Sequence, residues 1–562
     1  MGCVHDKQLP DQFEDFLRAD PCVGLPCSDC LQPDVRIGWV SSKDLRRRYD
    51  LVVIGGGPTG VAGAMRAALL GRRALVVDKP TSPQAHNKLD VSFAGPSGLF
   101  SKALRDSGMA IDVRLLRSLH HDEATIWKQI HGSSTDIAAA NAEQQVKALR
   151  DLGVDYLQAE ATIKSGQEVL VRKPNGDRQA VSTSSILVAT GSKPTRPAEI
   201  PFDDRRIVDE DTVNKLGFLP RRVVVVGSGV TAIEYAKIFQ LFGAEVVMLM
   251  RSGKMSSVRR IGLDRDVSAK LLETLALDSV HIYEHTTISG YHVPTRPDEP
   301  VRLDLESPVD GTPSSITCDL VLAAVGRTPN VQGLDLGRRG VELDEARGHI
   351  LVDEGFQTCV RGIYAAGDVI GPPALATTGV SQAQCAVQAM FGGGQLQKTA
   401  AYPVGIWTVP ECAYYGLTKE AAEEQGMSVS EGIADYSSCL RGCAFKPYGM
   451  LKLVFRTDDD VIVGVHIIGA DACELVHYGM GLVLQGVTIP SVITQLFEAN
   501  TYHNLYREAA IKGCPAARCD TSRTSTRRDA SKGPIRKMPP RTSPRTSPRT
   551  SPRTSPNTSR YR

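Results

Sequence analysis

Residues 50–79 read DLVVIGGGPTGVAGAMRAALLGRRALVVDK, and this stretch decides the fold. The sequence predicts, in order, a strand (residues 51–54), a glycine turn (55–60), a helix that ends at about residue 70, and a second strand (74–77). Gly71 suits the end of the helix because glycine readily adopts the left-handed conformation found there. Both strands are apolar throughout, which is typical of a parallel sheet covered on both faces.

Three glycines after the first strand, Gly55, Gly57 and Gly60, have the spacing GxGxxG. The first permits a tight turn, the second lets the backbone approach a pyrophosphate, and the third lets helix and strand pack closely. Free amides at the start of a helix favour phosphate groups. Asp78 ends the second strand, where a carboxylate can accept hydrogen bonds from a ribose. Together these features predict a dinucleotide site.

Residues 221–251, RRVVVVGSGVTAIEYAKIFQLFGAEVVMLMR, repeat the pattern. The sequence predicts a strand over residues 223–226, a turn with Gly227 and Gly229, a helix up to about residue 242, and a strand over residues 246–250. Ala232 takes the third glycine position, which is a permitted variant. Arg251 stands where the first unit has an acid. A guanidinium favours a 2′-phosphate, whereas a carboxylate would repel it. We therefore expect this unit to favour NADP(H); the alternative is that Arg251 is a solvated loop cation.

The chain has 562 residues, 42% hydrophobic and 23% charged, values that exclude collagen-like, fibrous and wholly disordered proteins. Residues 515–562 carry 13 Lys+Arg against 2 Asp+Glu, a net of +11, which leaves −9 for the rest of a chain whose total is +2. This tail repeats RTSP and has too few apolar residues to fold, so we expect it to be disordered. Tyr561 is its single aromatic residue, and stacking of nucleic-acid bases is not predicted.

The thirteen cysteines are unevenly spaced, and none lies between Cys30 and Cys318. No disulfide or thiolate–metal site can form within that interval, and no metal site is predicted. A secreted disulfide framework is not indicated. No stretch reaches the roughly 18 apolar residues of a membrane span, so we expect a cytoplasmic protein.

Four further motifs occur in order: VATG at 188–191, AVGRTPN at 324–330, YAAGD at 364–368 and WTVPE at 407–411. With the two glycine units, they make the chain from about Tyr49 to Gly513 resemble the pyridine nucleotide–disulfide oxidoreductases. This group includes dihydrolipoamide dehydrogenase, glutathione reductase and soluble pyridine nucleotide transhydrogenase. The resemblance implies an α/β fold with two Rossmann-like domains, one for FAD and one for NAD(P), and an α+β C-terminal dimerisation domain that builds a homodimer.

The resemblance also implies domain boundaries and site residues. The expected parts are an N-terminal extension (residues 1–47), an FAD-binding domain in two pieces (48–200 and 320–398), an NAD(P)-binding domain (201–319), an interface domain (399–513) and the tail (514–562). The residues implied for FAD are Gly55, Gly57, Gly60, Asp78, Lys102, Thr190, Gly191, Gly367 and Asp368. Those implied for NAD(P) are Gly227, Gly229, Ala232, Glu234, Arg251 and Gly326. Lys102 and Glu234 match a catalytic pair beside the flavin in relatives; the alternative is an ordinary pair on a helix surface.

Disulfide-reducing relatives carry a Cys-x4-Cys pair shortly before a Ser-Lys step. Here the step is Ser101-Lys102, and the two cysteine positions fall on Phe93 and Gly98. A redox disulfide requires two sulfurs within bonding reach. Soluble transhydrogenases usually keep one of these cysteines, and this chain keeps neither. Relocation of the dithiol to Cys27-x-x-Cys30 is the alternative.

The general-base stretch His-Pro-Thr-x-x-Glu of relatives is also altered. Its counterpart is ANTYHN at 499–504, with Ala499 in place of histidine and Asn504 in place of glutamate. His503 is out of register, and we expect it to be a surface or interface side chain rather than a base.

The expected enzyme passes hydride between pyridine nucleotides through FAD, as soluble transhydrogenases do, because no dithiol stands on the far side of the flavin. The alternatives are an NAD(P)H-dependent reductase of a quinone or other small acceptor, and a catalytically quiet flavoprotein scaffold. Met1-Gly2-Cys3 opens the chain as in proteins with myristate on Gly2 and palmitate on Cys3, which leaves anchoring to a membrane open.

Overall fold

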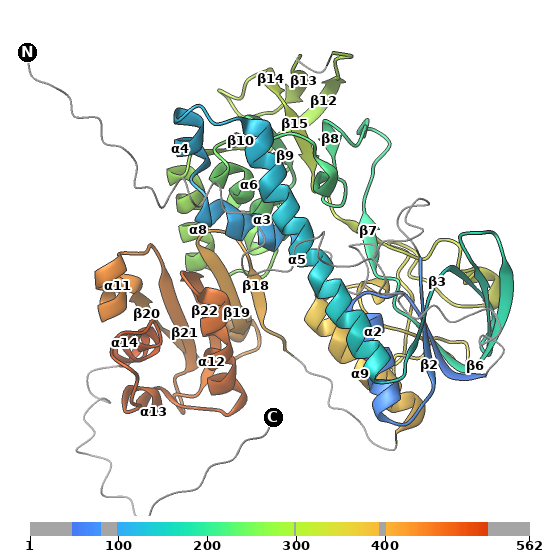
Figure 1. Cartoon of the computed structure of the whole chain (residues 1–562). Helices are drawn as coiled ribbons and strands as arrows, with labels where there is room; N and C mark the ends of the chain where they lie inside the picture. The colour runs from blue at the N-terminus through green and yellow to red at the C-terminus, as the bar shows by residue number, and fades with distance from the viewer. Residues whose placement is uncertain (1–47, 80–97, 297–298, 393–400, 515–562) are drawn as a thin grey trace, which may run out of the picture. The chain divides into compact units, whose positions relative to one another are not determined.

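The computed structural model describes residues 48–79, 98–296, 299–392 and 401–514 (Figure 1). The expectations for residues 1–47 and 515–562, including Gly2, Cys3, Cys27, Cys30 and the RTSP repeats, lie outside these ranges, as does Phe93. Within them, no helix is long and apolar enough to cross a membrane.

The first sheet has seven strands; five of them form the parallel sheet predicted from residues 50–79, and the other two are added antiparallel at one side. Its strands lie in the order β3 (Asp155–Gln158), β2 (Ala74–Asp78), β1 (Tyr49–Ile54), β6 (Arg178–Val188), β5 (Glu168–Arg172) and β4 (Glu160–Ser165), and β17 (Ile363–Ala365) also pairs with β6. β1 is parallel to β2 and β6. Val52 and Ile54 pack into the core on one face, and Leu51 and Val53 pack into the core on the other. Successive side chains alternate across a pleated strand, so both faces are buried.

Two helices cover one face of this sheet. α2 (Pro58–Leu69) connects β1 to β2, and α9 (Ala376–Phe391) packs along it (Figure 1). Leu70 caps α2, and Gly71 follows with φ of 70°, the conformation expected there. A Cβ on Gly63 of α2 would lie 2.6 Å from the Leu187 side chain on the sheet and 3.5 Å from the Ala383 side chain of α9. The glycine therefore allows α2 to pack closely against the sheet.

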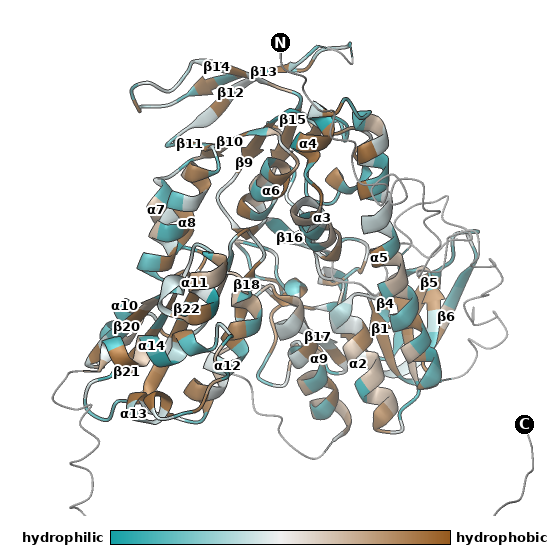
Figure 2. Cartoon of the chain, turned by 60° about the vertical axis from the view of Figure 1, so that its left-hand side comes forward, coloured by the Kyte–Doolittle hydropathy of each residue, from teal (hydrophilic) through white to brown (hydrophobic). Residues whose placement is uncertain are grey.

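The second sheet has five parallel strands and confirms the second unit (Figure 2). Its order is β11-β10-β9-β15-β8, over Val280–Glu284, Glu245–Met250, Arg222–Val226, Leu320–Ala323 and Ile207–Val208. α6 (Val230–Leu241) connects β9 to β10, and both strands begin one residue earlier than predicted. Because β15 belongs to this sheet, the second domain ends after Ala323; the expected return to the first domain at residue 320 was a few residues too early.

Short elements complete this half of the chain. The crossover between the two domains is a pair of antiparallel strands, β7 (Ser192–Pro194) and β16 (Arg327–Pro329). A three-stranded antiparallel sheet, β12-β13-β14, adjoins the second sheet over Thr287–His292, Val301–Glu306 and Ser315–Cys318. The helices α3, α4, α5, α7 and α8 span Leu99–Ala110, Val113–Ser118, Glu123–Asp151, Lys254–Arg259 and Arg265–Leu277.

The third sheet is antiparallel and forms the α+β domain expected at the C-terminal end. Its order is β18-β19-β22-β21-β20, over Val404–Ile406, Glu411–Gly416, Ile462–Gly469, Met450–Arg456 and Val429–Asp435. The helices of this domain are α10 (Lys419–Glu424), α11 (Leu440–Phe445), α12 (Ala472–Leu484), α13 (Ile489–Ile493) and α14 (Asn504–Gly513). α12 and α14 pack against this sheet and share its core.

Candidate functional site

The first glycine turn has the geometry of a phosphate cradle. Gly55 has φ of 110°, and a Cβ there would overlap the carbonyl oxygen of Ala189. A Cβ on Gly60 would overlap the carbonyl oxygen of Gly55, whereas the Cβ position of Gly57 has no atom within 4 Å. Gly57 caps α2 without any side chain on the first amides. Two glycines thus serve packing, and the third leaves open space where a pyrophosphate can approach.

Residues from distant parts of the chain converge on this cradle. The backbone nitrogen of Thr190 lies 3.0 Å from the Cβ position of Gly55, and Gly367 (φ of 80°) lies against Thr59 at the start of α2. Asp368 follows directly and accepts a 2.6 Å hydrogen bond from the Ser192 hydroxyl. The Thr190 hydroxyl is buried and has no hydrogen-bond partner among the described residues. Polar groups thus gather near Gly55 and Gly57.

The other residues expected at this cradle lie close by in the fold. Asp78 is the last residue of β2, and Gly191 (φ of 68°) accepts the backbone N–H of Asn330 through its carbonyl. The structure therefore brings all the residues implied for FAD to the carboxyl edge of the first sheet or the adjoining crossover, apart from Lys102, which lies on α3.

The second glycine turn repeats this geometry. Gly227 has φ of 138°, and a Cβ there would overlap the carbonyl oxygen of Ala324. Gly229 caps α6 and has open space at its Cβ position, and Ala232 is fully buried beside Gly227. Arg251 follows β10, is exposed and has no ion-pair or hydrogen-bond partner in the described part of the chain.

The crossover carries Gly326, the remaining residue implied for NAD(P). Gly326 has φ of 120°, and its carbonyl accepts the backbone N–H of Thr195. The residue thus lies where the chain leaves the second domain.

Lys102 and Glu234 form the ion pair expected from the sequence. Lys102 Nζ lies 2.6 Å from Glu234 Oε2, and the side chains are 26% and 7% exposed, which rules out an ordinary surface pair. The second carboxylate oxygen, Oε1, accepts a 2.8 Å hydrogen bond from the backbone N–H of Trp407. One carboxylate therefore joins α3, α6 and the segment before β19, which sequence reasoning did not predict.

A second buried link holds that segment. Arg105, one helical turn after Lys102 on α3, pairs with Glu411 at 3.0 Å and lies 4.6 Å from the Trp407 ring. Glu411 also accepts the backbone N–H of Cys473 at 3.0 Å. The Arg105 side chain is 5% exposed. The WTVPE motif contains Glu411, but no local sequence signal identifies Arg105 as the basic residue that pairs with it.

Gly98, one of the two positions where relatives have cysteines, lies beside this pair. Gly98 caps α3, and its carbonyl accepts a 2.8 Å hydrogen bond from the Ser101 hydroxyl. A Cβ at residue 98 would lie 3.3 Å from Lys102 Nζ. The free cysteines in the described ranges are Cys318, Cys359, Cys385, Cys412, Cys439, Cys443 and Cys473, all in later parts of the chain.

The altered general-base stretch packs within its own domain. His503 is half-buried, with its ring 5.7 Å from that of Tyr478 and 6.4 Å from that of Tyr506. Ala499 and Asn504 carry no ionisable group. His503 is thus part of an aromatic cluster, and its surroundings give no sign of an acid–base partner among the described residues.

The crossover contains a polar network that sequence reasoning missed. Arg327 donates to the Ser192 hydroxyl and carbonyl, each at 2.8 Å, and pairs with Glu210 at 2.7 Å. Since the Ser192 hydroxyl in turn donates to Asp368, the network connects the first cradle to the segment before β9. Burial raises the pKa of Glu210, although Arg327 opposes the shift. Glu210 Oε2 accepts no hydrogen bond within the described ranges.

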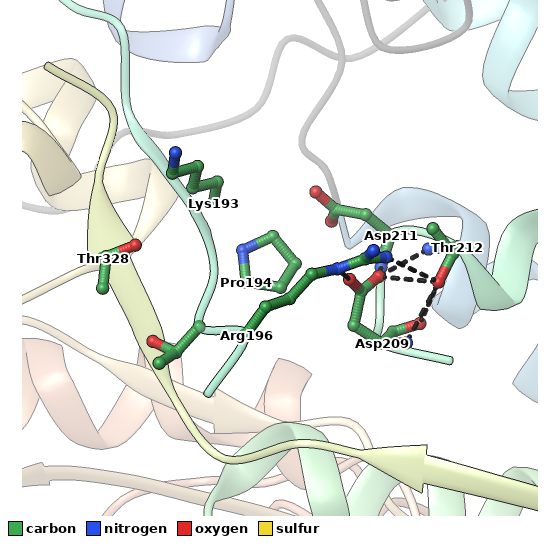
Figure 3. Close-up of a pocket in the computed structure, with 8 residues that line it drawn as sticks. Lys193, Pro194, Arg196, Asp209, Asp211, Thr212 and Thr328 are labelled. Carbon is green, nitrogen blue, oxygen red and sulfur yellow. Dashed lines mark hydrogen bonds and ion pairs between the residues drawn. The ribbon is translucent and has the colours of Figure 1, made fainter. Parts of the chain in front are cut away.

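A pocket of about 490 Å³ lies beside this network (Figure 3). It is lined by Lys193, Pro194, Thr195, Arg196, Asp209, Asp211, Thr212 and Thr328. Arg196 Nε donates to Asp209 at 2.6 Å, and its guanidinium lies over the Phe202 ring. Burial opposes ionisation of Asp209, but hydrogen bonds from Arg196 and Thr212 outweigh it and lower its pKa. The lining charges are thus largely paired, and no group of His, Cys, Asp and Glu in the described ranges could hold a metal ion.

Comparison with known proteins decides the family. Residues 49–389 match the model of the pyridine nucleotide-disulphide oxidoreductases, and residues 402–510 match that of their dimerisation domain. The chain belongs to this family. It is therefore an FAD-dependent oxidoreductase of pyridine nucleotides, with an α/β fold and a C-terminal dimerisation domain that supports a homodimer.

Two bacterial relatives align with this chain over almost their whole length. The soluble pyridine nucleotide transhydrogenase of Mycobacterium bovis (strain BCG / Pasteur 1173P2) is 30% identical over 83% of this chain and 97% of its own length. That of Pseudomonas fluorescens (strain Pf0-1) is 31% identical over 83% and 98%. Among solved structures, the Cu(II) complex of HOCl-induced flavoprotein disulfide reductase RclA from Escherichia coli has a TM-score of 0.71 and 18% identity, over 83% and 99% of the two chains. This structural likeness shows the shared fold.

Proposed function

We propose that this chain transfers hydride between NAD(H) and NADP(H) without a redox disulfide. The observation that carries the proposal is the contrast between the buried Lys102–Glu234 pair and the glycine beside it. The pair is intact, whereas residue 98, 3.3 Å from Lys102 Nζ at its Cβ position, has no thiol. The 30%-identical transhydrogenases support the same reaction.

The residues of the two cradles fit the two cofactors of the family. In the proposal, Gly57 and the first amides of α2 hold the pyrophosphate of FAD, with Asp78 and Asp368 near its sugar groups. The open Cβ positions of Gly57 and Gly229 support this assignment, because each leaves room for a phosphate at a helix start. Gly229 and α6 hold the pyrophosphate of the nicotinamide nucleotide, and Arg251 accepts a 2′-phosphate.

When bound, FAD would supply the redox chemistry by accepting hydride from one nicotinamide and returning it to another. Lys102 keeps a cation at the site, and Glu234 holds that cation through a 2.6 Å contact. The Trp407 N–H fixes the second oxygen of Glu234, which restricts rotation of the carboxylate. A buried cation needs such a partner because removal from water is costly. The role of Lys102 and Glu234 is thus to maintain positive potential where the flavin ring would lie.

Initial-rate kinetics with NADPH and thio-NAD⁺ test this proposal. We expect parallel lines in double-reciprocal plots, which indicate a ping-pong transfer, and no reduction of lipoamide or oxidised glutathione. Reduction of a quinone without transfer to thio-NAD⁺ would instead make the chain a quinone reductase. Failure of NADPH to bleach the flavin would make it a catalytically quiet flavoprotein.

We also propose that Gly2 and Cys3 carry acyl chains that bind the protein to a membrane. Met1-Gly2-Cys3 matches the start of the acylation signal, although Asp6 stands where the signal has Ser or Thr. Two acyl chains would anchor the protein, whereas one alone is marginal. Metabolic labelling with palmitate, lost in Gly2→Ala, is the expected result. Absence of label from the intact protein would contradict it.

A further inference from the structure

A carboxylate lies beside Arg251 at the carboxyl edge of the second sheet. β10 and β11 are parallel neighbours, and their last residues, Met250 and Glu284, are paired in register (Figure 2). The backbone N–H of Thr286 donates to the Met250 carbonyl at 3.0 Å, which keeps the two strand ends together. Adjacent strands lie about 4.8 Å apart, so Glu284 is the acidic residue next to the segment that begins with Arg251.

The Glu284 carboxylate turns toward that segment. Its Oε2 accepts a 2.9 Å hydrogen bond from the backbone N–H of Lys254, and its Oε1 lies 3.8 Å from Lys254 Nζ. The Cβ position of Gly253 lies 3.6 Å from Glu284 Oε2 and 3.4 Å from His285 Nε2. The Glu284 side chain is 33% exposed, so a bound molecule can reach it. One negative charge is therefore fixed beside Lys254, in the segment that begins with Arg251.

In a dinucleotide-binding unit, the ribose next to the adenine lies at the end of the second strand. An acid there accepts hydrogen bonds from the 2′-hydroxyl of NAD, and a basic residue accommodates the 2′-phosphate of NADP. Here Arg251 follows the end of β10, and an acid, Glu284, ends the neighbouring strand β11. The basic residue that favours the 2′-phosphate and the acid that favours an unphosphorylated ribose thus lie at the ends of two neighbouring strands.

We propose that Glu284 is a specificity-determining residue that weakens binding of the 2′-phosphate and supports binding of an unphosphorylated ribose, so that one site accepts both nucleotides. This inference rests on the proposed function, because transfer between NADPH and NAD⁺ through one cradle requires both to bind. Arg251 attracts the 2′-phosphate, and Glu284 opposes it. The balance of the two charges sets the ratio of affinities.

Calorimetric titration of the oxidised, FAD-loaded enzyme with NADP⁺ and with NAD⁺ tests the inference without turnover. In Glu284→Gln we expect NADP⁺ to bind about three- to tenfold more tightly, while NAD⁺ binds the same or more weakly. Arg251→Gln should shift the ratio in the opposite direction. Glu245→Gln is the matched control, because Glu245 is an exposed glutamate at the other end of β10.

Equal changes in the two affinities in Glu284→Gln, or no change in either, would overturn the inference. So would a wild-type enzyme that binds only one of the two nucleotides. A purely structural role for the Lys254 hydrogen bond would lower the melting temperature of Glu284→Gln and leave the ratio of affinities unchanged. If transhydrogenation itself proved absent, both titrations would still report on Glu284, so the two proposals can fail separately.

Discussion

The two sides of the Lys102 site differ sharply. On one side, Glu234 and the Trp407 N–H hold the lysine in a buried network. On the other side lies Gly98, where disulfide-reducing relatives have a cysteine, and the general-base stretch has alanine and asparagine at its key positions. The described residues thus include the pair that we propose acts next to a flavin, and they have no thiol at residue 98 and no ionisable group at residues 499 and 504.

This contrast teaches that the fold and the disulfide chemistry are separable. The three sheets do not depend on a thiol between residues 31 and 317, because their strands are held by apolar cores and backbone hydrogen bonds. The network around Lys102 depends on side chains from three domains. Variants in the network around Lys102 should therefore have large effects on activity or stability, and a variant at residue 98 should have a small effect.

The largest effect is expected from Lys102→Met. The change removes the half-buried cation and leaves the buried Glu234 without its ionic partner, so we expect the rate of flavin reduction by NADPH to fall by about a hundredfold. Anaerobic stopped-flow absorbance measures this rate. Lys128→Met, at an exposed position of α5, is the control and should react like the wild type. A normal rate in Lys102→Met would show that the Lys102–Glu234 pair takes no part in flavin reduction.

The next effect is on stability, from Arg105→Gln. Glu411 would lose its buried partner, and we expect the free energy of unfolding to fall by about 3 kcal/mol. Thermal melting of the FAD-loaded enzyme detects the loss. Arg265→Gln removes an exposed ion pair with Asp266 and should cost less than about 1 kcal/mol. If both variants melted alike, Arg105 would not hold the Trp407 segment.

A smaller, pH-dependent effect is expected from Glu210→Gln at the crossover. Burial raises the pKa of Glu210, so the folded state favours its protonated form. The stability that this proton contributes is complete below the ordinary pKa of about 4.5 and is lost as pH rises through the raised value. The melting temperature of Glu210→Gln, relative to wild type, should thus increase between pH 4 and pH 7. A relative melting temperature that falls over this range would contradict the assignment.

The smallest effect is expected from Gly98→Cys. The nearest atom to the new Cβ is Lys102 Nζ at 3.3 Å, the end of a long side chain that a small shift can accommodate, so the protein should fold. One thiol lacks a partner at residue 93, and residues 499–504 supply no base in the expected register. We therefore expect no reduction of lipoamide or oxidised glutathione, measured as NADPH consumption, with transfer to thio-NAD⁺ largely retained. Appearance of disulfide reduction would show that a single sulfur restores the lost side.

Local sequence signals predicted both glycine units to within one or two residues, because the apolar strands and the glycine spacing act over about thirty neighbouring positions. The Lys102–Glu234 contact was implied by family resemblance and is confirmed. The Trp407 hydrogen bond to Glu234 and the Ser192–Arg327–Glu210 network were missed. They connect residues more than a hundred positions apart, and only packing of the domains brings those residues together.

The most direct test of the central claim is an anaerobic double-mixing experiment on the wild-type enzyme. NADPH first bleaches the flavin, and the product is then mixed with thio-NAD⁺ or with lipoamide. The account predicts rapid return of the flavin absorbance with thio-NAD⁺ and none with lipoamide beyond that of buffer alone. Return of the absorbance with lipoamide at a comparable rate would contradict it.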